Sequence, residues 1–303
     1  MRALNNTATL KTSPIKNVSK ELNAILSKSA GNTSANQGSF DQNYDDRTVD
    51  LLGVQIDNVT MNDAIESVMR SLEWPNNGAP TKSVSFVNAD CVNLYANDEE
   101  YRGVLNSNHR VFADGVGVRI AVKWAGKQIK DNVNGTDLFP LLCEKLSTEN
   151  KKVFLYGAKP EVVEKVAQRL EAEYPGLQVV GYQDGYLNSD NPEKICAEIN
   201  RSKADILFVA LGAPRQEKWI ANNQHRLNVK VAMGVGGLFD FYSGTVSRAP
   251  LWLRERSLEW VWRLIQQPKD KAKRYLIGNP VFLFRAFKAA FLTKHDEADR
   301  KLV

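Results

Sequence analysis

Along the middle of the chain, short runs of apolar residues alternate with segments in which apolar residues recur every three or four positions. Val163, Val166, Leu170 and Tyr174 mark one segment of the second kind, which predicts a helix. The apolar runs predict strands covered on both faces, and they span residues 83–87, 153–157, 178–182, 206–212 and 229–237. Because strands and helices alternate, the pattern predicts a layered, Rossmann-like α/β fold with a mostly parallel sheet.

The two ends of the chain depart from this pattern. Residues 1–48 are rich in Asn, Ser, Thr and Lys with little apolar periodicity, which predicts a disordered N-terminal extension. Residues 49–250 then form the α/β core. Residues 251–303 carry twelve Lys or Arg and six Asp or Glu, while the net charge of the whole chain is +5. The basic character therefore belongs to a C-terminal helical appendage.

The appendage separates apolar from basic residues on different helical faces. One stripe carries Leu258, Val261, Trp262 and Ile265, and another carries Arg256, Trp260 and Arg263. Arginine beside tryptophan suits a lipid headgroup boundary, and frequent Phe and Leu suit lipid better than a polyanion. We therefore expect the appendage to associate with a membrane surface and not with nucleic acid. Packing on the core or a homo-oligomer contact is the alternative. No run of about eighteen uncharged apolar residues is present, so we expect no transmembrane helix.

The composition excludes several kinds of chemistry. Cys91, Cys143 and Cys196 are far apart in apolar stretches, which argues against a disulfide framework and a structural metal. The start of the chain lacks the apolar core of a secretory signal, so we expect a cytoplasmic protein. The patterns of a P-loop, a dinucleotide fingerprint and a nucleophile elbow are absent. An Asp-x-Asp pair that would chelate a divalent cation is absent too, so we expect neither a metal nor another cofactor.

The stretch VFADGVGVRIAVKWAG, residues 111–126, contains the most informative acidic residue. Asp114 follows a short apolar run and precedes Gly115 and Gly117, which is where a helix N-cap would stand. The alternative role is a general base, which needs a carboxylate near a substrate hydroxyl at the end of a strand. The local sequence leaves both roles open.

Three further polar loops follow predicted strands or precede helices, and ligands of such folds bind beyond the carboxyl ends of the strands. In VNGTDLF, Asn134, Thr136 and Asp137 are helix caps or contacts to a sugar. In ALGAPRQEKW, Gln216 and Glu217 occupy a first helical turn that is either solvated or ligand-binding. In GVGGLFDFYSG, the glycines form a tight turn or let backbone N–H groups approach a phosphate.

Six segments occur in this order along the chain: FADGVG, VNGTDL, VFLYGAKP, YPGLQVVGYQDGY, ADILFVALGAPRQEKWI and AMGVGGLFDFYSGTVSRAP. With the basic tail behind them, they resemble the WecG/TagA/CpsF family of bacterial glycosyltransferases over about residues 50–290. The resemblance implies an inverting hexosyltransferase, peripheral on the inner face of the cell membrane. Such an enzyme moves a hexose from a UDP-sugar to a polyprenyl-diphosphate-linked monosaccharide in exopolysaccharide or cell-surface polysaccharide biosynthesis.

The resemblance also implies roles for particular residues. Asp114 stands at the position of the family's proposed general base. The substrate-binding positions it implies are Asn88, Asn134, Thr136, Asp137, Gln216, Glu217, Gly234, Gly236, Gly237 and Asp240. The family's appendage closes over the site and docks on the membrane, with basic residues at the acceptor diphosphate. The candidates for that contact are Arg256, Arg263, Arg274 and Arg285. Charge on the departing UDP would be balanced by N–H groups of the glycine loop and by arginines of the tail.

The predicted identity of the sugars depends on a few sequence positions that differ between branches of the family. Teichoic-acid-type members carry an arginine where this chain has Asn132, and DNVNGTD is closer to the xanthan-type β-1,4-glucosyltransferase branch. The leading expectation is therefore glucose, transferred from UDP-glucose to lipid-linked glucose. The alternatives are transfer of N-acetylmannosamine or its uronate to lipid-linked N-acetylglucosamine, and a non-catalytic nucleotide-sugar-binding or scaffold protein of an assembly complex.

Overall fold

The structure is a computed structural model that describes residues 48–73, 78–187 and 189–300, with side chains to residue 292. The disordered extension predicted for residues 1–48 lies outside the described residues, apart from Thr48.

A central sheet of six parallel strands runs through the described part of the chain, in the order β4-β3-β8-β7-β5-β6. Its strands are β3 (Lys82–Val87), β4 (Arg110–Ala113), β5 (Lys152–Gly157), β6 (Gln178–Gln183), β7 (Ile206–Ala210) and β8 (Val231–Gly234). All of β7 and nearly all of β5 are buried, because helices cover both faces of the sheet. The predicted α/β fold with a mostly parallel sheet is confirmed.

Two strands are shorter than the apolar runs that predict them. β7 ends at Ala210 and β8 ends at Gly234, so residues 211–212 and 235–237 belong to loops at the carboxyl edge of the sheet. An antiparallel hairpin of β1 (Thr48–Leu51) and β2 (Val54–Asp57) was not predicted. Each of its strands has only four residues, which is too short for a clear alternating pattern.

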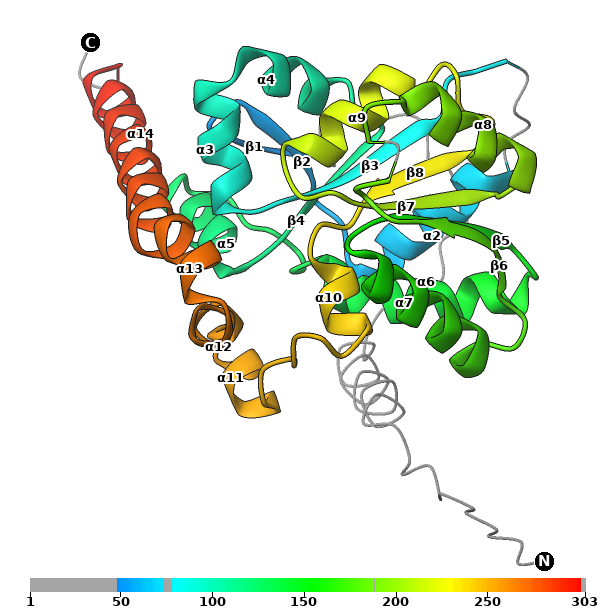
Figure 1. The fold of residues 1–303 in the computed structure, drawn as a ribbon. Coiled ribbons are helices and arrows are strands. Elements are labelled where there is room, and N and C mark those ends of the chain that lie inside the picture. The colour runs from blue at the N-terminus through cyan, green and yellow to red at the C-terminus, as the bar shows by residue number, and fades with distance from the viewer. Residues whose placement is uncertain (1–47, 74–77, 188, 301–303) are drawn as a thin grey trace, which may run out of the picture. The chain divides into compact units, whose positions relative to one another are not determined.

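Helices form a layer on each face of the sheet (Figure 1). One layer contains α3 (Ala89–Asn97), α4 (Glu99–Asn106), α8 (Pro192–Ser202) and α9 (Arg215–Asn223). The other contains α2 (Met61–Glu73), α6 (Gly135–Thr148), α7 (Pro160–Glu173) and the short α10 (Leu238–Tyr242). The predicted stripe of α7 is confirmed, since Val163, Val166 and Leu170 are buried and Tyr174 is its C-cap.

The C-terminal segment is helical, as predicted, and consists of several pieces. They are α11 (Leu251–Glu255), α12 (Glu259–Gln266), α13 (Pro268–Ala272), the π-helical turn η2 (Lys273–Gly278) and α14 (Asn279–Arg300). Figure 1 shows α14 beside α3 and α5 (Val116–Trp124), and both helices contact it. None of the helices in the described ranges is both long and apolar enough to cross a membrane.

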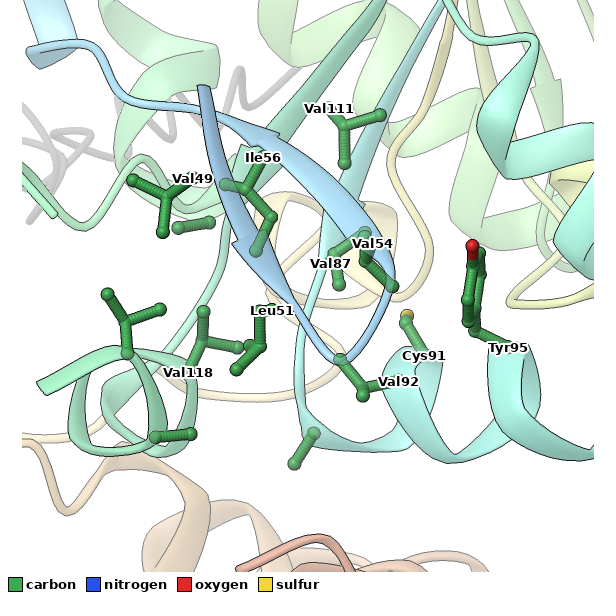
Figure 2. Packing of buried hydrophobic residues seen from close by; sticks show 14 of the residues in the cluster. Val49, Leu51, Val54, Ile56, Val87, Cys91, Val92, Tyr95, Val111 and Val118 are labelled. Carbon is green, nitrogen blue, oxygen red and sulfur yellow. The ribbon is translucent and has the colours of Figure 1, made fainter. Parts of the chain in front are cut away.

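One apolar cluster joins the hairpin, the edge of the sheet and the C-terminal helix. Figure 2 shows Val49, Leu51, Val54 and Ile56 of the hairpin facing residues of β3, β4, α3 and α5. Phe282 of α14 belongs to the same cluster and is 0% exposed. Full burial of such a side chain contributes about 1.5–3 kcal/mol. Helix α14 is thus attached to the described part of the chain by core packing. The division at residue 250 into core and appendage stays a prediction.

Candidate active site

Asn88 and Asp114 stand at the carboxyl ends of neighbouring strands. Asn88 directly follows β3 and Asp114 directly follows β4, and these strands pair in parallel. The backbone N–H of Asp114 donates to the carbonyl oxygen of Val87 over 2.8 Å. The Nδ2 of Asn88 donates to Oδ2 of Asp114 over 3.4 Å, although the two residues are 26 positions apart. The parallel sheet therefore brings two of the predicted site residues together at the edge where ligands bind.

Asn88 is held in place by helix α3, which it caps. Its Oδ1 accepts hydrogen bonds from the backbone N–H groups of Asp90 and Cys91, over 3.1 and 3.3 Å. Only the oxygen of an amide can accept, so these bonds leave the Nδ2 group to face Asp114. Asn88 is thus an oriented donor to the carboxylate.

Gly115, and not Asp114, is the N-cap residue of helix α5. It makes no side-chain capping bond, and its φ of 95° lies in a region that favours glycine. Its backbone N–H donates to Oδ1 of Asn132 over 2.6 Å. The capping role for Asp114 is therefore wrong, and its carboxylate accepts from the Asn88 amide instead.

The surroundings of Asp114 change its acidity in opposing directions. Removal of water raises the pKa of its carboxyl group above the ordinary 3.8, while the Asn88 hydrogen bond and the charges of Arg274 and Arg263 lower it. The net result is a raised pKa, although the residue remains partly exposed. Such a carboxylate is a stronger base than an ordinary aspartate.

The side chain of Gln216 joins two loops at the same edge of the sheet. Its Oε1 accepts hydrogen bonds from Gly212 N–H over 3.1 Å and from Gly236 N–H over 2.8 Å. These loops follow the paired strands β7 and β8. Its Nε2 donates to Oε1 of Glu217 over 2.8 Å, and both side chains are buried. The pair therefore lies beneath the loops and inside the protein.

The glycines of the loop after β8 make room for two side chains. A Cβ on Gly234 would lie 2.9 Å from Nε2 of Gln216, and a Cβ on Gly237 would collide with the guanidinium of Arg263. The N–H of Val235 donates to the carbonyl of Val209, and the N–H of Gly236 to Gln216. Two of the N–H groups expected to face a phosphate are thus engaged within the protein.

Three cations of the C-terminal segment lie close to one another, and two of them act on Asp114. The charges of Arg274 and Arg263 lower the pKa of Asp114. The pKa of Lys271 is lowered by burial and by the same two arginines, against a smaller opposite effect of Asp240 and Asp270. Cations that oppose one another's charge in this way form a site suited to an anion. Lys271 was not among the predicted contacts, although it lies in the basic run KDKAKR.

Arg263 lies directly against the glycine loop, beside Gly237. Its guanidinium lies 4.5 Å from the centroid of the Phe241 ring, and its Nη2 is 4.0 Å from Oδ2 of Asp240. Its Nε is buried and has no hydrogen-bond partner among the described residues. Arg274 pairs with Asp90 of α3 at 3.5 Å. The predicted residues Arg263, Arg274 and Asp240 thus lie on the side of the site that faces the appendage.

The other two predicted arginines lie in different surroundings. Arg256 is exposed, with its guanidinium 6.0 Å from the centroid of the Trp252 ring. Arg285 of α14 donates to Oδ1 of Asn93 over 3.3 Å and to Oδ1 of Asn97 over 3.1 Å. Arg285 therefore ties α14 to α3, and a contact from either arginine to the acceptor stays a prediction.

The polar residues of NGTD are bonded largely to one another. Asn134 caps α6 by accepting from the N–H of Asp137 over 2.9 Å, and the hydroxyl of Thr136 donates to the same oxygen. Asp137 accepts from Nδ2 of Asn134 and pairs with Arg248 at 2.8 Å. Arg248 also pairs with Glu259 of α12 at 3.2 Å. The capping alternative for Asn134 is confirmed, and Arg248, which the sequence did not single out, links this loop to the C-terminal segment.

The acidic, histidine and cysteine residues of the described ranges are scattered with respect to metal binding. No group of three or more His, Cys, Asp or Glu side chains there is arranged to hold a metal ion. Metal-independent activity stays a prediction.

Comparisons with known proteins agree with one another. The model of the Glycosyl transferase WecG/TagA/CpsF family matches residues 49–296. A protein of Bacillus subtilis (strain 168) is 37% identical over 185 residues, which cover 61% of this chain and 72% of the relative. A protein of Staphylococcus aureus (strain MW2) is 30% identical over 241 residues, which cover 80% of this chain and 92% of the relative. Both are named N-acetylglucosaminyldiphosphoundecaprenol N-acetyl-beta-D-mannosaminyltransferase.

Proposed function

The chain belongs to the WecG/TagA/CpsF family of glycosyl transferases, and from this premise we propose that it transfers N-acetylmannosamine from a UDP-sugar to N-acetylglucosaminyl-diphospho-undecaprenol. The observation that carries the proposal is the Asn88–Asp114 pair at the carboxyl edge of the sheet, with Arg263 and Arg274 of the appendage close to Asp114 and Lys271 close to these arginines. A base beside a cationic site suits a reaction in which a hydroxyl attacks and a diphosphate leaves.

The choice of sugar differs from the glucose that the sequence favours. The names of the B. subtilis and S. aureus relatives specify an N-acetylmannosaminyl group and an N-acetylglucosaminyl acceptor, which supports the alternative. The glucose expectation depends on Asn132. This side chain is neutral, and it accepts a hydrogen bond from the Gly115 N–H. We therefore assign it a role in shaping the Asp114 loop.

In the proposed reaction the acceptor hydroxyl attacks the anomeric carbon opposite the leaving group. The new C–O bond forms as the bond from that carbon to the diphosphate oxygen breaks, and UDP leaves with the electron pair. The hydroxyl proton passes to the carboxylate of Asp114. Because attack and departure take place on opposite faces of the anomeric carbon in one step, the anomeric configuration inverts. A base of this kind contributes about 10²–10⁴-fold to the rate. Its raised pKa and the fixed Asn88 donor support this assignment.

We assign to Arg263, Lys271 and Arg274 the role of stabilising the negative charge on the leaving diphosphate. Support comes from their closeness to one another, from the unpartnered Nε of Arg263, and from the engagement of the Val235 and Gly236 N–H groups elsewhere. Preorganised cations in a site shielded from water stabilise developing negative charge more than they would in bulk solvent.

The appendage is assigned to the cytoplasmic face of the membrane, where the lipid acceptor would lie. Its outer surface, here called the apolar face, carries exposed Leu276, Ile277, Val281, Phe284, Phe287, Phe291 and Leu292. Exposed Lys273 and Lys288 lie beside it. An apolar helical face with flanking lysines favours binding in the plane of an anionic bilayer.

The test is a donor and acceptor panel read by product mass. UDP-N-acetylmannosamine and UDP-glucose are each offered with short-chain lipid diphosphates that carry N-acetylglucosamine or glucose. We expect one product, with the mass of N-acetylmannosamine joined to the N-acetylglucosamine lipid, and at least about a hundredfold less of it with Asp114→Asn. Transfer of glucose instead would overturn the sugar assignment. An absence of turnover with every pair would favour a nucleotide-sugar-binding or scaffold protein.

A further inference from the structure

Glu217 places a carboxyl group in the interior behind the glycine loop. The residue lies in the first turn of α9 and is 2% exposed. Its Oε1 accepts from Nε2 of Gln216, and its Oε2 has no hydrogen-bond partner among the described residues. Burial raises its pKa to about 7. Burial of a carboxyl group with an unpaired oxygen costs folding free energy, so another interaction must offset this cost.

The offsetting interaction is the hydrogen bond that Glu217 accepts from the Gln216 amide. Gln216 uses its oxygen to accept from Gly212 N–H and Gly236 N–H, one from each of the loops after β7 and β8. The nitrogen at the other end of the amide then needs an acceptor, because a buried, unpaired donor costs the full loss of its hydration. Glu217 Oε1, at 2.8 Å, is that acceptor. With it, both ends of the Gln216 amide are satisfied.

The position of the glycine loop follows from this amide. Gly234 packs directly against the Gln216 side chain, and the next glycine, Gly236, donates its N–H to it. Gly237 follows and lies against the guanidinium of Arg263. A shift of the amide would therefore move the backbone on which Arg263 rests.

We propose that Glu217 is a positioning residue, which holds the Gln216 amide so that the loops after β7 and β8 keep the spacing of the donor site. The inference rests on the proposed function only in taking this edge as the side where the UDP group binds. It also departs from the family resemblance, in which Glu217 contacts the donor directly. The side chain is too deeply buried for such a contact.

The test compares Glu217→Leu, which removes the acceptor but fills the space, with Glu217→Gln, which keeps a carbonyl oxygen at the same reach. Glu161→Leu is the matched control, since Glu161 is an exposed residue in the first turn of α7. UDP binding is measured by calorimetry, and amide hydrogen exchange is followed in peptides that contain Gly212 and Gly236. We expect Glu217→Leu to weaken UDP binding about tenfold and to speed exchange at both loops. Glu217→Gln and Glu161→Leu should stay within about threefold of the original chain.

The two readouts separate this inference from the proposed function. If the unaltered chain does not bind UDP, the donor assignment fails, and exchange at Gly212 and Gly236 still decides the role of Glu217. Unchanged exchange in Glu217→Leu would overturn the inference, as would a lower melting temperature with unaltered UDP affinity. Should Glu217→Leu not fold, Gln216→Leu serves instead. It must speed exchange at the same two loops, and adding Glu217→Gln to it must cause no further increase.

Discussion

The two halves of the proposed site are built in different ways. The sheet-edge half consists of Asn88 and Asp114, which meet because they follow adjacent parallel strands. The appendage half consists of Arg263, Lys271 and Arg274, carried by helices that follow the last strand of the sheet. The first half depends on the sheet and on helix α3, which orients Asn88. The second depends on how a C-terminal segment is attached to distant parts of the chain.

That attachment combines apolar and polar contacts. Phe282 is buried in the cluster under the hairpin, and its ring packs beside Gly117, the second glycine of FADGVG. Asn93 donates to the carbonyl of Gly278 over 2.8 Å, across 185 residues of sequence. Proton transfer by Asp114 and attachment of the C-terminal helices can therefore be disturbed separately, and each has its own measurement.

The largest effect is expected from a substitution that removes the proton acceptor and leaves the C-terminal helices attached. Asp114→Asn keeps the shape of the side chain but cannot take a proton, so we expect transfer to fall about 10²–10⁴-fold. The melting temperature and vesicle binding should stay unchanged, because Asp114 contributes no cap to α5. Product formation under saturating donor measures the loss. Exposed Asp190→Asn is the control, and a variant that melts earlier but turns over normally would contradict the role.

The difference between the halves also explains what the sequence could predict. Near-continuous apolar runs made β5 and β7 predictable, and the rule that parallel strands share a carboxyl edge made the Asp114 region a candidate site. The reason for Gly234 and Gly237 was not predictable, because Gln216 and Arg263, which pack on them, lie 18 and 26 residues away. The core role of Phe282 was hidden for the same reason, since its partners precede it by well over a hundred residues.

The second largest effect is expected from a substitution that loosens the attachment of α14 and leaves Asp114 unchanged. Phe282→Ala leaves a cavity under the hairpin, and we expect the free energy of unfolding to fall by about 3–5 kcal/mol. Transfer should fall with it as the appendage half loses its support. Phe284→Ala, two residues along on a side chain that is 68% exposed, should change stability by less than about 0.5 kcal/mol. Denaturant unfolding measures both, and equal losses would show that α14 is not held by Phe282.

The third effect concerns the interior behind the sheet-edge half. The pKa of Glu217 is raised from 4.5 to about 7 in the folded protein, so the folded state holds this proton more tightly than the unfolded state. The stabilisation is present in full below about pH 4.5 and is lost as the pH rises through about 7, a change of ~3 kcal/mol. Relative to Glu217→Gln, the original chain should therefore lose stability over this window. Unfolding curves at pH 4.5 and pH 8 measure it, and parallel pH profiles for the two proteins would contradict the raised pKa.

The smallest effect tests what the appendage half does besides carrying cations. Ile277 and Phe284 are 59% and 68% exposed on the apolar face, so their replacement by serine costs the fold little. If that face enters a bilayer, Ile277→Ser with Phe284→Ser should weaken sedimentation with anionic vesicles by about tenfold or more, because two apolar side chains no longer leave water. Exposed Tyr186→Ser is the control at the other end of the sheet. Transfer to a water-soluble acceptor analogue should persist in the double variant, since Asp114 and the three cations are untouched. Loss of transfer there with unaltered vesicle binding would mean that the apolar face shapes the site and does not dock on lipid.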